Sequence, residues 1–355
     1  MTTGTILRVL FGCGVLLVLM GIALTVVVSF VESGPDERVG FPATLPTVPK
    51  PPPEPPIPPA IVLAGHTRTV NALAFSRDGT TLASASTDAT VKLWDVRTGI
   101  ESRTIRAASG PLYGVGWTAE GYLVTGSATA RRMAGVISWW DPKAAYGSEE
   151  YEGGELVWWN AQTGQECRKI GVPNGMVSAL AVSPDGEWIG YSIGGMFEVI
   201  PSAVESSRAP IAKFRGFTEA NHVLFAPEGR KIFVCSRDGP QMITLDETPA
   251  LKALDQNEPH LKLGNHSPPQ AFSPDGKYIA TGSASKLRLS DRLSGKAIGH
   301  FSAGSEESYA ITCIAFSPDG SQIAVGGGQG EFGQAFRWVS NYKVYLWNTS
   351  EMVKP

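Results

Sequence analysis

Two short segments of the 355-residue chain match spacings that enzymes use, but both lack the context that the chemistry requires. Gly190-Tyr191-Ser192-Ile193-Gly194 fits G-x-S-x-G, in which a serine nucleophile sits on a strand–turn–helix elbow. Residues 196–200 continue instead as a predicted strand, so we expect a hairpin here. Gly328 to Gly333 fits G-x-G-x-x-G, but no helix follows whose N-terminus could hold a pyrophosphate. We therefore predict that the protein is not an enzyme and has no catalytic or cofactor-binding residue.

The cysteines do not form the spacing of a metal site. The four cysteines, at positions 13, 167, 235 and 313, include no C-x-x-C pair and have no histidine pair nearby. This pattern argues against structural zinc and against a dense disulfide framework, and we predict no metal. Cys167, Cys235 and Cys313 fall in predicted strands, where we expect small residues of the core.

The composition favours a turn-rich β protein. Hydrophobic residues make 43% of the chain, which excludes disorder over most of its length. Charged residues make 18%, below the usual quarter, and the chain has 40 glycines and 26 prolines, which argues against a helical bundle. The net charge of −3 does not steer the whole chain towards nucleic acid, and no nucleic-acid partner is predicted.

One turn, ending in an acidic residue and glycine, recurs six times. Its copies are Ser76-Arg77-Asp78-Gly79, Thr118-Ala119-Glu120-Gly121, Ser183-Pro184-Asp185-Gly186, Ala226-Pro227-Glu228-Gly229, Ser273-Pro274-Asp275-Gly276 and Ser317-Pro318-Asp319-Gly320. Successive glycines are 42, 65, 43, 47 and 44 residues apart. Each copy lies between two apolar runs. The Asp side chain can hydrogen-bond the backbone of its own turn and Gly supplies a positive φ, so each copy is suited to close a hairpin between two strands. The chain is therefore predicted to contain six strand–hairpin–strand units.

The first repeat, residues 64–104, has the most complete pattern. It opens with Gly65-His66 and closes with Thr90-Val91-Lys92-Leu93-Trp94-Asp95. This pattern resembles the WD40 (WD-repeat) family. The resemblance implies a four-stranded blade with a buried hydrogen-bond network, for which we choose Ser84 over Ser86. The residues of this network would be His66, Ser84, Asp88 and Trp94. A satisfied buried network makes its surroundings rigid, so these residues are predicted to be structural.

The resemblance covers roughly residues 60–350 and weakens between its ends. Repeats two and six keep tryptophan, in Trp158-Trp159 and Trp347, whereas repeats three and four lack it and are expected to rely on apolar packing. We expect an all-β WD-repeat β-propeller with six blades. Seven blades are the alternative, because one repeat step is long. In this family the first strand completes the last blade, so residues 60–64 are expected to pair with residues 343–347.

Two long connections offer a candidate binding site. They run from about Ala128 to Gly154 and from about Gly328 to Asn341, and family geometry places both on one face with only the first blade between them. Aromatic residues together with arginine are favoured at protein interfaces. The candidate partner-binding residues are Arg131, Arg132, Trp139, Trp140, Tyr146, Phe332, Arg337 and Trp338. The alternative for any one aromatic residue is that it packs its loop onto its own blade.

The N-terminus has the features of a membrane anchor and a stalk. After a short tail, residues 1–8, residues 9–31 contain no charge, and at about 1.5 Å per residue a helix of this length spans a bilayer core of roughly 30 Å. We predict an uncleaved transmembrane helix; the alternative is a signal peptide that is removed. Residues 32–59 form a linker with ten prolines between positions 42 and 59, which suits a semi-rigid spacer. The propeller would occupy 60–350 and a C-terminal tail 351–355.

These predictions combine into a membrane-anchored scaffold that binds one or more protein partners without catalysis. Arg8 precedes the apolar run and acidic residues follow it, so the positive-inside rule favours a cytoplasmic N-terminus and an extracytoplasmic propeller. Removal of the apolar run would instead give a secreted protein. The alternative function is a propeller enzyme or a carbohydrate-binding module that uses the aromatic loop face.

Overall fold

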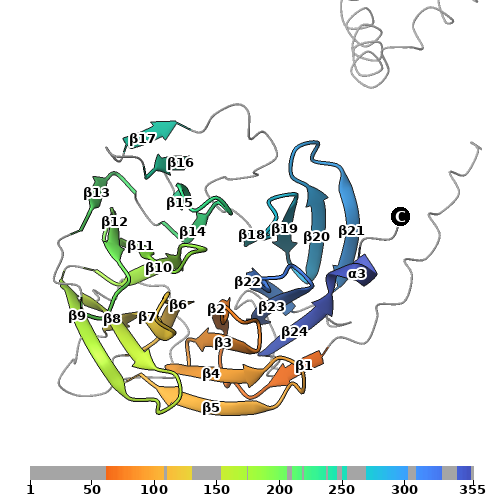
Figure 1. The fold of residues 1–355 in the computed structure, drawn as a ribbon, viewed down its shortest axis with the longest axis horizontal. Coiled ribbons are helices and arrows are strands. Elements are labelled where there is room, and N and C mark those ends of the chain that lie inside the picture. The colour runs from red at the N-terminus through yellow and green to blue at the C-terminus, as the bar shows by residue number, and fades with distance from the viewer. Residues whose placement is uncertain are drawn as a thin grey trace, which may run out of the picture. The chain divides into compact units, whose positions relative to one another are not determined.

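The computed structural model describes residues 61–107, 110–129, 153–173, 175–205, 210–217, 220–236, 239–245, 250–253, 269–302, 309–329 and 342–352. These residues form six four-stranded antiparallel sheets, which lie around a ring as the blades of a propeller (Figure 1). The six-bladed all-β fold predicted from the repeats is confirmed. The predicted tail 1–8, transmembrane helix 9–31 and linker 32–59 lie outside the described residues.

Each blade has its strands in chain order from the ring axis outwards, except the last. Blades 1 to 3 contain β2 (Val70–Phe75), β3 (Thr81–Ser86), β4 (Thr90–Asp95) and β5 (Glu101–Arg106); β6 (Leu112–Trp117), β7 (Tyr122–Thr129), β8 (Gly153–Asn160) and β9 (Glu166–Pro173); and β10 (Val177–Val182), β11 (Trp188–Ile193), β12 (Met196–Pro201) and β13 (Ala212–Arg215). Blades 4 to 6 contain β14 (His222–Phe225), β15 (Lys231–Ser236), β16 (Gly239–Thr244) and β17 (Ala250–Ala253); β18 (Gln270–Phe272), β19 (Tyr278–Ser283), β20 (Lys286–Asp291) and β21 (Ala297–Ser302); and β22 (Tyr309–Phe316), β23 (Gln322–Gln329), β24 (Lys343–Asn348) and β1 (Ile61–Ala64). A short helix, α3 (Thr349–Met352), follows β24.

Blade 6 is completed by the first strand of the propeller. β1 pairs antiparallel with β24, with Ile61 opposite Leu346 and Ala64 opposite Lys343. The predicted pairing of the two ends is therefore confirmed. Leu63 is 1% exposed and packs in the cluster that contains Val70 and Trp94 of blade 1, whereas Val62 is 47% exposed. One side chain of β1 thus joins blade 6 to blade 1.

The recurring turn forms because its side chains bond its own backbone. In blade 1, Ser76 Oγ donates to Asp78 Oδ1 at 2.6 Å, and the same oxygen accepts the backbone N–H of Thr80 at 3.0 Å. Gly79 has φ of +72°, a conformation that favours glycine. The same serine-to-aspartate bond recurs in blades 5 and 6, at Asp275 and Asp319. The predicted G-x-S-x-G segment is, as expected, part of β11 and the turn that follows it.

A β-bulge near the start of several inner strands ties neighbouring blades together. The register shifts at Asn71, Ser178 and Thr312, where one extra residue stands in the strand. Asn71 Nδ2 donates to Leu112 O of blade 2 at 2.8 Å, and Ser178 Oγ donates to Ala220 O before blade 4 at 2.8 Å. Thr312 Oγ1 donates to Val70 O across the junction of blades 6 and 1. The ring is therefore closed on its inner side as well as through β1.

The cysteine prediction was wrong at one position. Cys235 and Cys313 are buried, but Cys167 is exposed. Cys167 lies in β9, the outermost strand of blade 2, where only one neighbouring strand covers the backbone and most side chains contact solvent. Periodicity identifies a strand but not its place in the sheet, which decides the burial.

No helix among the described residues is long and apolar enough to cross a membrane.

The closing strand predicts a clear difference between two adjacent substitutions. We expect Leu63→Ala to lower the free energy of unfolding by about 2–5 kcal/mol, because it opens a cavity between blades 6 and 1. Val62→Ala, on the same strand but exposed, is the matched control and should change it by less than about 0.5 kcal/mol. Urea denaturation followed by tryptophan fluorescence measures both. Equal effects of the two substitutions would mean that β1 does not close the ring as described.

Candidate interaction face

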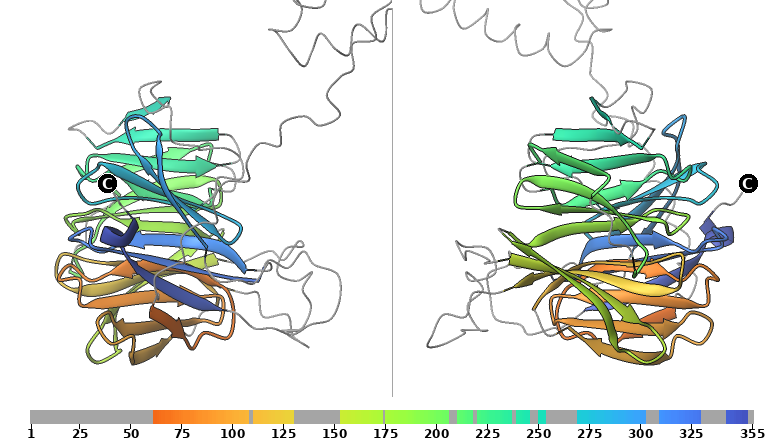
Figure 2. Two further views of the ribbon diagram at one scale, coloured as in Figure 1. Left: turned by 90° about the vertical axis from the view of Figure 1, so that its right-hand side faces the viewer. Right: turned by 60° about the vertical axis from the view of Figure 1, so that its left-hand side comes forward.

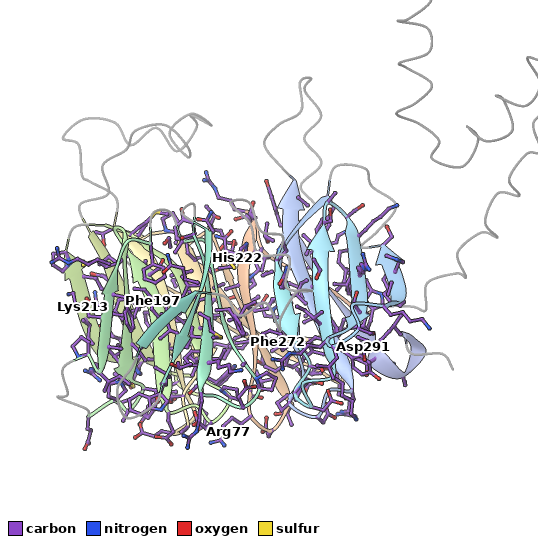
Figure 3. The ribbon with its side chains drawn as sticks, turned by 90° about the horizontal axis from the view of Figure 1, so that it is seen from above. Arg77, Phe197, Lys213, His222, Phe272 and Asp291 are labelled. Atoms are coloured by element: carbon purple, nitrogen blue, oxygen red, sulfur yellow. The ribbon has the colours of Figure 1, made fainter. Side chains whose placement is uncertain are left out.

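The two faces of the ring carry different connections. In blades 1 to 5 the chain passes from the first to the second strand, and from the third to the fourth, at one face, here called the hairpin face; in blade 6 it passes from β22 to β23 at this face. The turns between the second and third strands, and the connections between blades, lie on the other, here called the loop face. Seen edge-on, the strands run from one face to the other (Figure 2). Arg77 lies at the hairpin face and His222 lies towards the loop face (Figure 3).

Both long connections leave from the loop face and flank blade 1. One joins β7 to β8 in blade 2, and the other joins β23 to β24 in blade 6. All eight candidate partner-binding residues, Arg131, Arg132, Trp139, Trp140, Tyr146, Phe332, Arg337 and Trp338, lie outside the described residues.

The described ends of these connections rest against blade 1. Ala128 N–H, at the end of β7, donates to Pro111 O of the connection from blade 1 at 3.1 Å. A Cβ added to Gly328, in β23, would come within 3.0 Å of Thr69 Oγ1 of blade 1. The β7–β8 ladder continues from the Leu123–Trp159 pair to Thr129–Gly153, further towards the loop face than the equivalent ladder of blade 1. Blade 1 therefore lies between the described ends of the two connections, here called the loop bases, and each loop base is held by contacts with a neighbouring segment.

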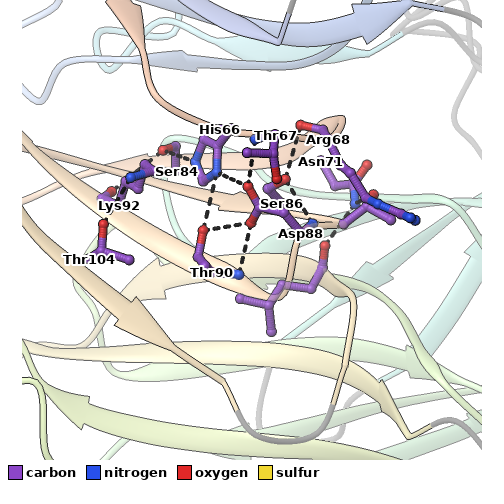
Figure 4. Close-up of polar contacts among 12 residues, drawn as sticks. His66, Thr67, Arg68, Asn71, Ser84, Ser86, Asp88, Thr90, Lys92 and Thr104 are labelled. Carbon is purple, nitrogen blue, oxygen red and sulfur yellow. Dashed lines mark hydrogen bonds and ion pairs between the residues drawn. The ribbon is translucent and has the colours of Figure 1, made fainter. Parts of the chain in front are cut away.

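The turn of blade 1 between these bases is fixed by a buried network (Figure 4). Trp94 Nε1 donates to Ser84 Oγ at 2.8 Å, and Ser84 Oγ lies 2.7 Å from His66 Nε2. His66 Nδ1 lies 2.9 Å from Asp88 Oδ2, and Asp88 Oδ1 accepts the N–H of Thr90 at 3.0 Å. One set of protons satisfies every group: Trp94 donates to Ser84, Ser84 to His66, and His66 to Asp88. The structure thus brings together the four residues chosen from the sequence.

The environment of Asp88 favours its charged form. Burial alone would raise the pKa of Asp88, but the hydrogen bonds from His66 and Thr90 outweigh burial and hold the pKa well below its usual range. Asp88 also accepts the N–H of Thr67 at 2.9 Å. A charged Asp88 therefore fixes two segments of the loop face, the start of the repeat and the turn before β4.

Blade 3 replaces this network with one that the sequence analysis missed. Tyr191 stands at the register position of Ser84, and its hydroxyl donates to Glu198 Oε2 at 2.6 Å. Glu198 Oε1 lies 2.5 Å from Lys213 Nζ, and burial is the first cause that raises the pKa of Tyr191. Blade 3 packs through buried apolar side chains, as expected, and adds this polar network, which was not predicted. The signal was Glu198, a carboxylate inside an otherwise apolar strand.

Blades 2 and 6 also have a tryptophan at this register position, but only the indole N–H of blade 2 has a hydrogen-bond partner among the described residues. In blade 2, Trp159 Nε1 donates to Thr125 Oγ1 at 2.9 Å. In blade 6, Trp347 Nε1 is buried and has no hydrogen-bond partner within the described part of the chain. In blade 6, Ile323 pairs with Trp347, and Val325 lies two residues further along the same strand. Ser84 of blade 1 and Thr125 of blade 2 occupy the equivalent position relative to their own tryptophans. Blade 6 therefore holds an unsatisfied donor at its core.

A channel of about 540 Å³ runs along the ring axis between the inner strands of all six blades. Towards the loop face its lining is polar and includes Asn71, Tyr113, Asn221 and Thr312. At the hairpin face it is bordered by Arg77 and by four turn prolines, at positions 184, 227, 274 and 318. The described lining contains no carboxylate, and no cluster of three or more metal-ligating side chains occurs among the residues that the structure describes.

Comparison with known proteins identifies the repeats. The sequence profile of the WD40 family, described as "WD domain, G-beta repeat", matches residues 58–95, 266–290 and 295–331. Protein Mut11 of Chlamydomonas reinhardtii is 55% identical over 42 residues, which make 12% of this chain and 11% of that protein. The match to Mut11 therefore has the length of one repeat.

The unsatisfied tryptophan of blade 6 can be given a partner. We expect Val325→Thr to raise the free energy of unfolding by about 1 kcal/mol, because the new hydroxyl accepts from Trp347 Nε1. The matched control is Val234→Thr, at the same register position in blade 4, where Ile243 replaces the tryptophan. It should lower the free energy of unfolding by about 1–3 kcal/mol, because its hydroxyl is buried without that donor. Denaturant midpoints measure both changes. A lower midpoint for both variants would contradict the assignment of Trp347 Nε1 as an unsatisfied donor.

The Asp88 network predicts a particular pH dependence. Because the pKa of Asp88 is lower in the folded chain than the usual value of about 3.9, the unfolded chain binds the proton first as the pH falls. This contribution to stability is therefore present above about pH 4 and is lost below it. Asp88→Asn should make the loss of stability between about pH 5 and pH 2 shallower than in the wild type, because the variant lacks this contribution. Glu187→Gln, an exposed change on the hairpin face, is the control, and an equal change of slope in both variants would contradict the prediction.

Proposed function

We propose that the chain, a six-bladed β-propeller in which three segments match the WD40 repeat profile, acts as a scaffold that binds a protein partner through its loop face and catalyses no reaction. The observation that carries the proposal is the placement of two long connections on this one face, on either side of blade 1. Connections on a rigid support are the usual place for recognition, because the support fixes their ends while the loop sequences are free to vary.

The rigidity of the support comes from blade 1 and its neighbours. The network from Trp94 to Asp88 fixes the central turn, and hydrogen bonds between blades hold the ring on both sides of it. A partner that contacts both connections therefore meets two loops whose bases keep a constant separation. Preorganisation of this kind lowers the entropic cost of binding.

We further propose that the chain is anchored in a membrane by residues 9–31, with a cytoplasmic N-terminus and an extracytoplasmic propeller. Support comes from the uncharged run of 23 residues and from Arg8 before it. The chain enters the propeller at Ile61, on the hairpin face, because Ile61 pairs with Leu346 near the end of β24.

Alkaline carbonate extraction of cells that express the full chain tests the anchor. We expect the wild type to stay in the membrane pellet, and Leu16→Arg combined with Leu19→Arg to move into the supernatant, because two charges in the bilayer centre oppose insertion. The mass of the purified chain shows whether residues 1–31 are retained. A chain that lacks residues 1–31 and is found in the medium would show that this segment is a cleaved signal peptide and not a membrane anchor.

Affinity capture tests the loop face. We expect the full chain to capture a specific protein partner, and the triple variant Trp139→Ala, Trp140→Ala and Trp338→Ala to lose it. Ile100→Ala with Leu293→Ala is the control, because these side chains are 66% and 86% exposed on turns of the hairpin face. All three proteins should unfold at the same denaturant concentration. An unchanged set of partners in the triple variant would contradict the assignment of the site.

A further inference from the structure

The closing strand β1 is held at the junction of blades 6 and 1 by a small set of contacts. It is the outermost strand of its sheet and pairs over four residues with one neighbour, β24 (Figure 1). Leu63 is its one buried side chain, and it packs with Val344 and Leu346 of β24 and with blade 1. Ile61 rests on the β4–β5 turn, because a Cβ added to Gly99 would lie 2.6 Å from Ile61 Cγ2. Loss of β1 would therefore leave every other pair of strands in the six sheets intact.

The chain is fixed again directly after β1. His66 Nε2 lies 2.7 Å from Ser84 Oγ, and His66 Nδ1 lies 2.9 Å from Asp88 Oδ2. The backbone N–H of Thr67 donates to the same oxygen of Asp88 at 2.9 Å. A chain that is pulled away along β1 therefore meets this network two residues after β1 ends, and its detachment stops at His66.

The inner side of the same junction does not depend on β1. Thr312 Oγ1 donates to Val70 O, which joins blade 6 to blade 1 beside the ring axis. Cys313 and Ala324 of blade 6 pack in one cluster with Val70 of blade 1. The ring would therefore stay assembled without β1, while the outer part of this junction opens.

β1 also supports one of the loop bases. Ala64 pairs with Lys343, the first residue of β24 after the long connection of blade 6. Two residues further along the chain, His66 is bonded to the turn of blade 1. The end of β1 thus ties the base of this connection to blade 1, and its release removes the tie. A loop base with fewer fixed contacts is less preorganised for binding.

We propose that β1 is a latch that tension releases: a pull on the chain before Ile61 detaches residues 61–65, the detachment stops at His66, and the loop face loses part of its preorganised shape. This inference rests on the proposed function, because an anchored chain with a bound partner places the load on β1. Residues 9–31 precede β1, so tension between a bilayer and a partner on the loop face passes through Ile61 before it reaches any blade. The strand pairs again when the load falls, because the released residues stay tethered beside β24.

The pairing of the two strands fixes the length of the expected step. Ile61 lies opposite Leu346 and Ala64 opposite Lys343, so the N-terminal end of β1 and the C-terminal end of β24 lie at one end of the pair. A pull between the two chain ends therefore separates one pair of residues after another, beginning at Ile61. Five released residues at about 3.4 Å each give about 17 Å, and the point of attachment withdraws along β24 by a similar length. The chain should lengthen by about 30 Å in total.

Magnetic tweezers measure this step. The full chain is held in an uncharged detergent between tags at its two ends, and the force is raised slowly. We expect a reversible step of about 30 Å before the blades unfold. At one force, Leu63→Ala should detach at least about tenfold faster than the wild type, because it lacks the buried side chain of β1. Val62→Ala, on the same strand but exposed, should stay within about twofold of the wild type.

A disulfide provides the matched control for the origin of the step. Val62→Cys with Tyr345→Cys places two thiols on directly opposite residues of β1 and β24, at a separation that a disulfide can span. We expect the step to be absent in the oxidised variant and to return when a reductant opens the bond. Each molecule is its own control, because a step that arises elsewhere in the chain occurs in both states.

Three results would overturn the inference. The first is unfolding of the blades without an earlier step, and the second is a step that persists in the oxidised variant. The third is a step much longer than about 30 Å, which would mean that the detachment does not stop at His66.

The test needs neither a partner nor a bilayer, so it is separate from the tests of the proposed function. Absence of the step in a chain that captures its partner through the loop face would overturn the latch and leave the proposed function standing. The described step in a chain that carbonate extraction removes from the membrane would overturn the role in tension, because no load would reach β1.

Discussion

Pairing of β1 with β24 is the interaction on which the other features depend. A propeller buries its blades only against one another, so an open ring would expose one face of blade 6 and one face of blade 1. Four residues, Ile61–Ala64, supply the missing strand, and Leu63 fills the space between the two blades. Thr312 adds a hydrogen bond to Val70 across the same junction. This junction borders blade 1 directly, so closure also sets the distance between the bases of the two long connections.

The blades solve the same packing problem with different chemistry. At one register position, blade 1 has the chain of bonds from Trp94 through Ser84 to His66, blade 2 has Trp159 on Thr125, and blade 3 has Tyr191 on Glu198. Each of these bonds lies within its own blade. Blade 6 alone among these leaves a described tryptophan donor without a partner. The full network stands in blade 1, which is the blade that supports the candidate interaction face.

The sequence predicts the blades well because their turns are local. The recurring turn, which reads Ser-Pro-Asp-Gly in three of its six copies, carries its own hydrogen-bond donors and acceptors and a glycine with positive φ, so the six copies predict six hairpins without any tertiary information. The resemblance to the WD40 family also implies the closing strand, because in that family the first strand completes the last blade. The Tyr191–Glu198–Lys213 network could not be found in this way, since its residues meet only once the register of three strands is known. The exposure of Cys167 likewise depends on its place in the sheet, at the outermost strand of blade 2.

Binding of the partner at the loop face beside blade 1 can be measured by amide hydrogen exchange of the full chain, with and without its captured partner. We expect slower exchange on binding in the loop-face segments, residues 66–69, 87–90 and 106–107. We expect no change in the hairpin turns, residues 76–80, 183–187 and 273–277. Slower exchange in the hairpin turns, with the loop-face segments unchanged, would contradict it.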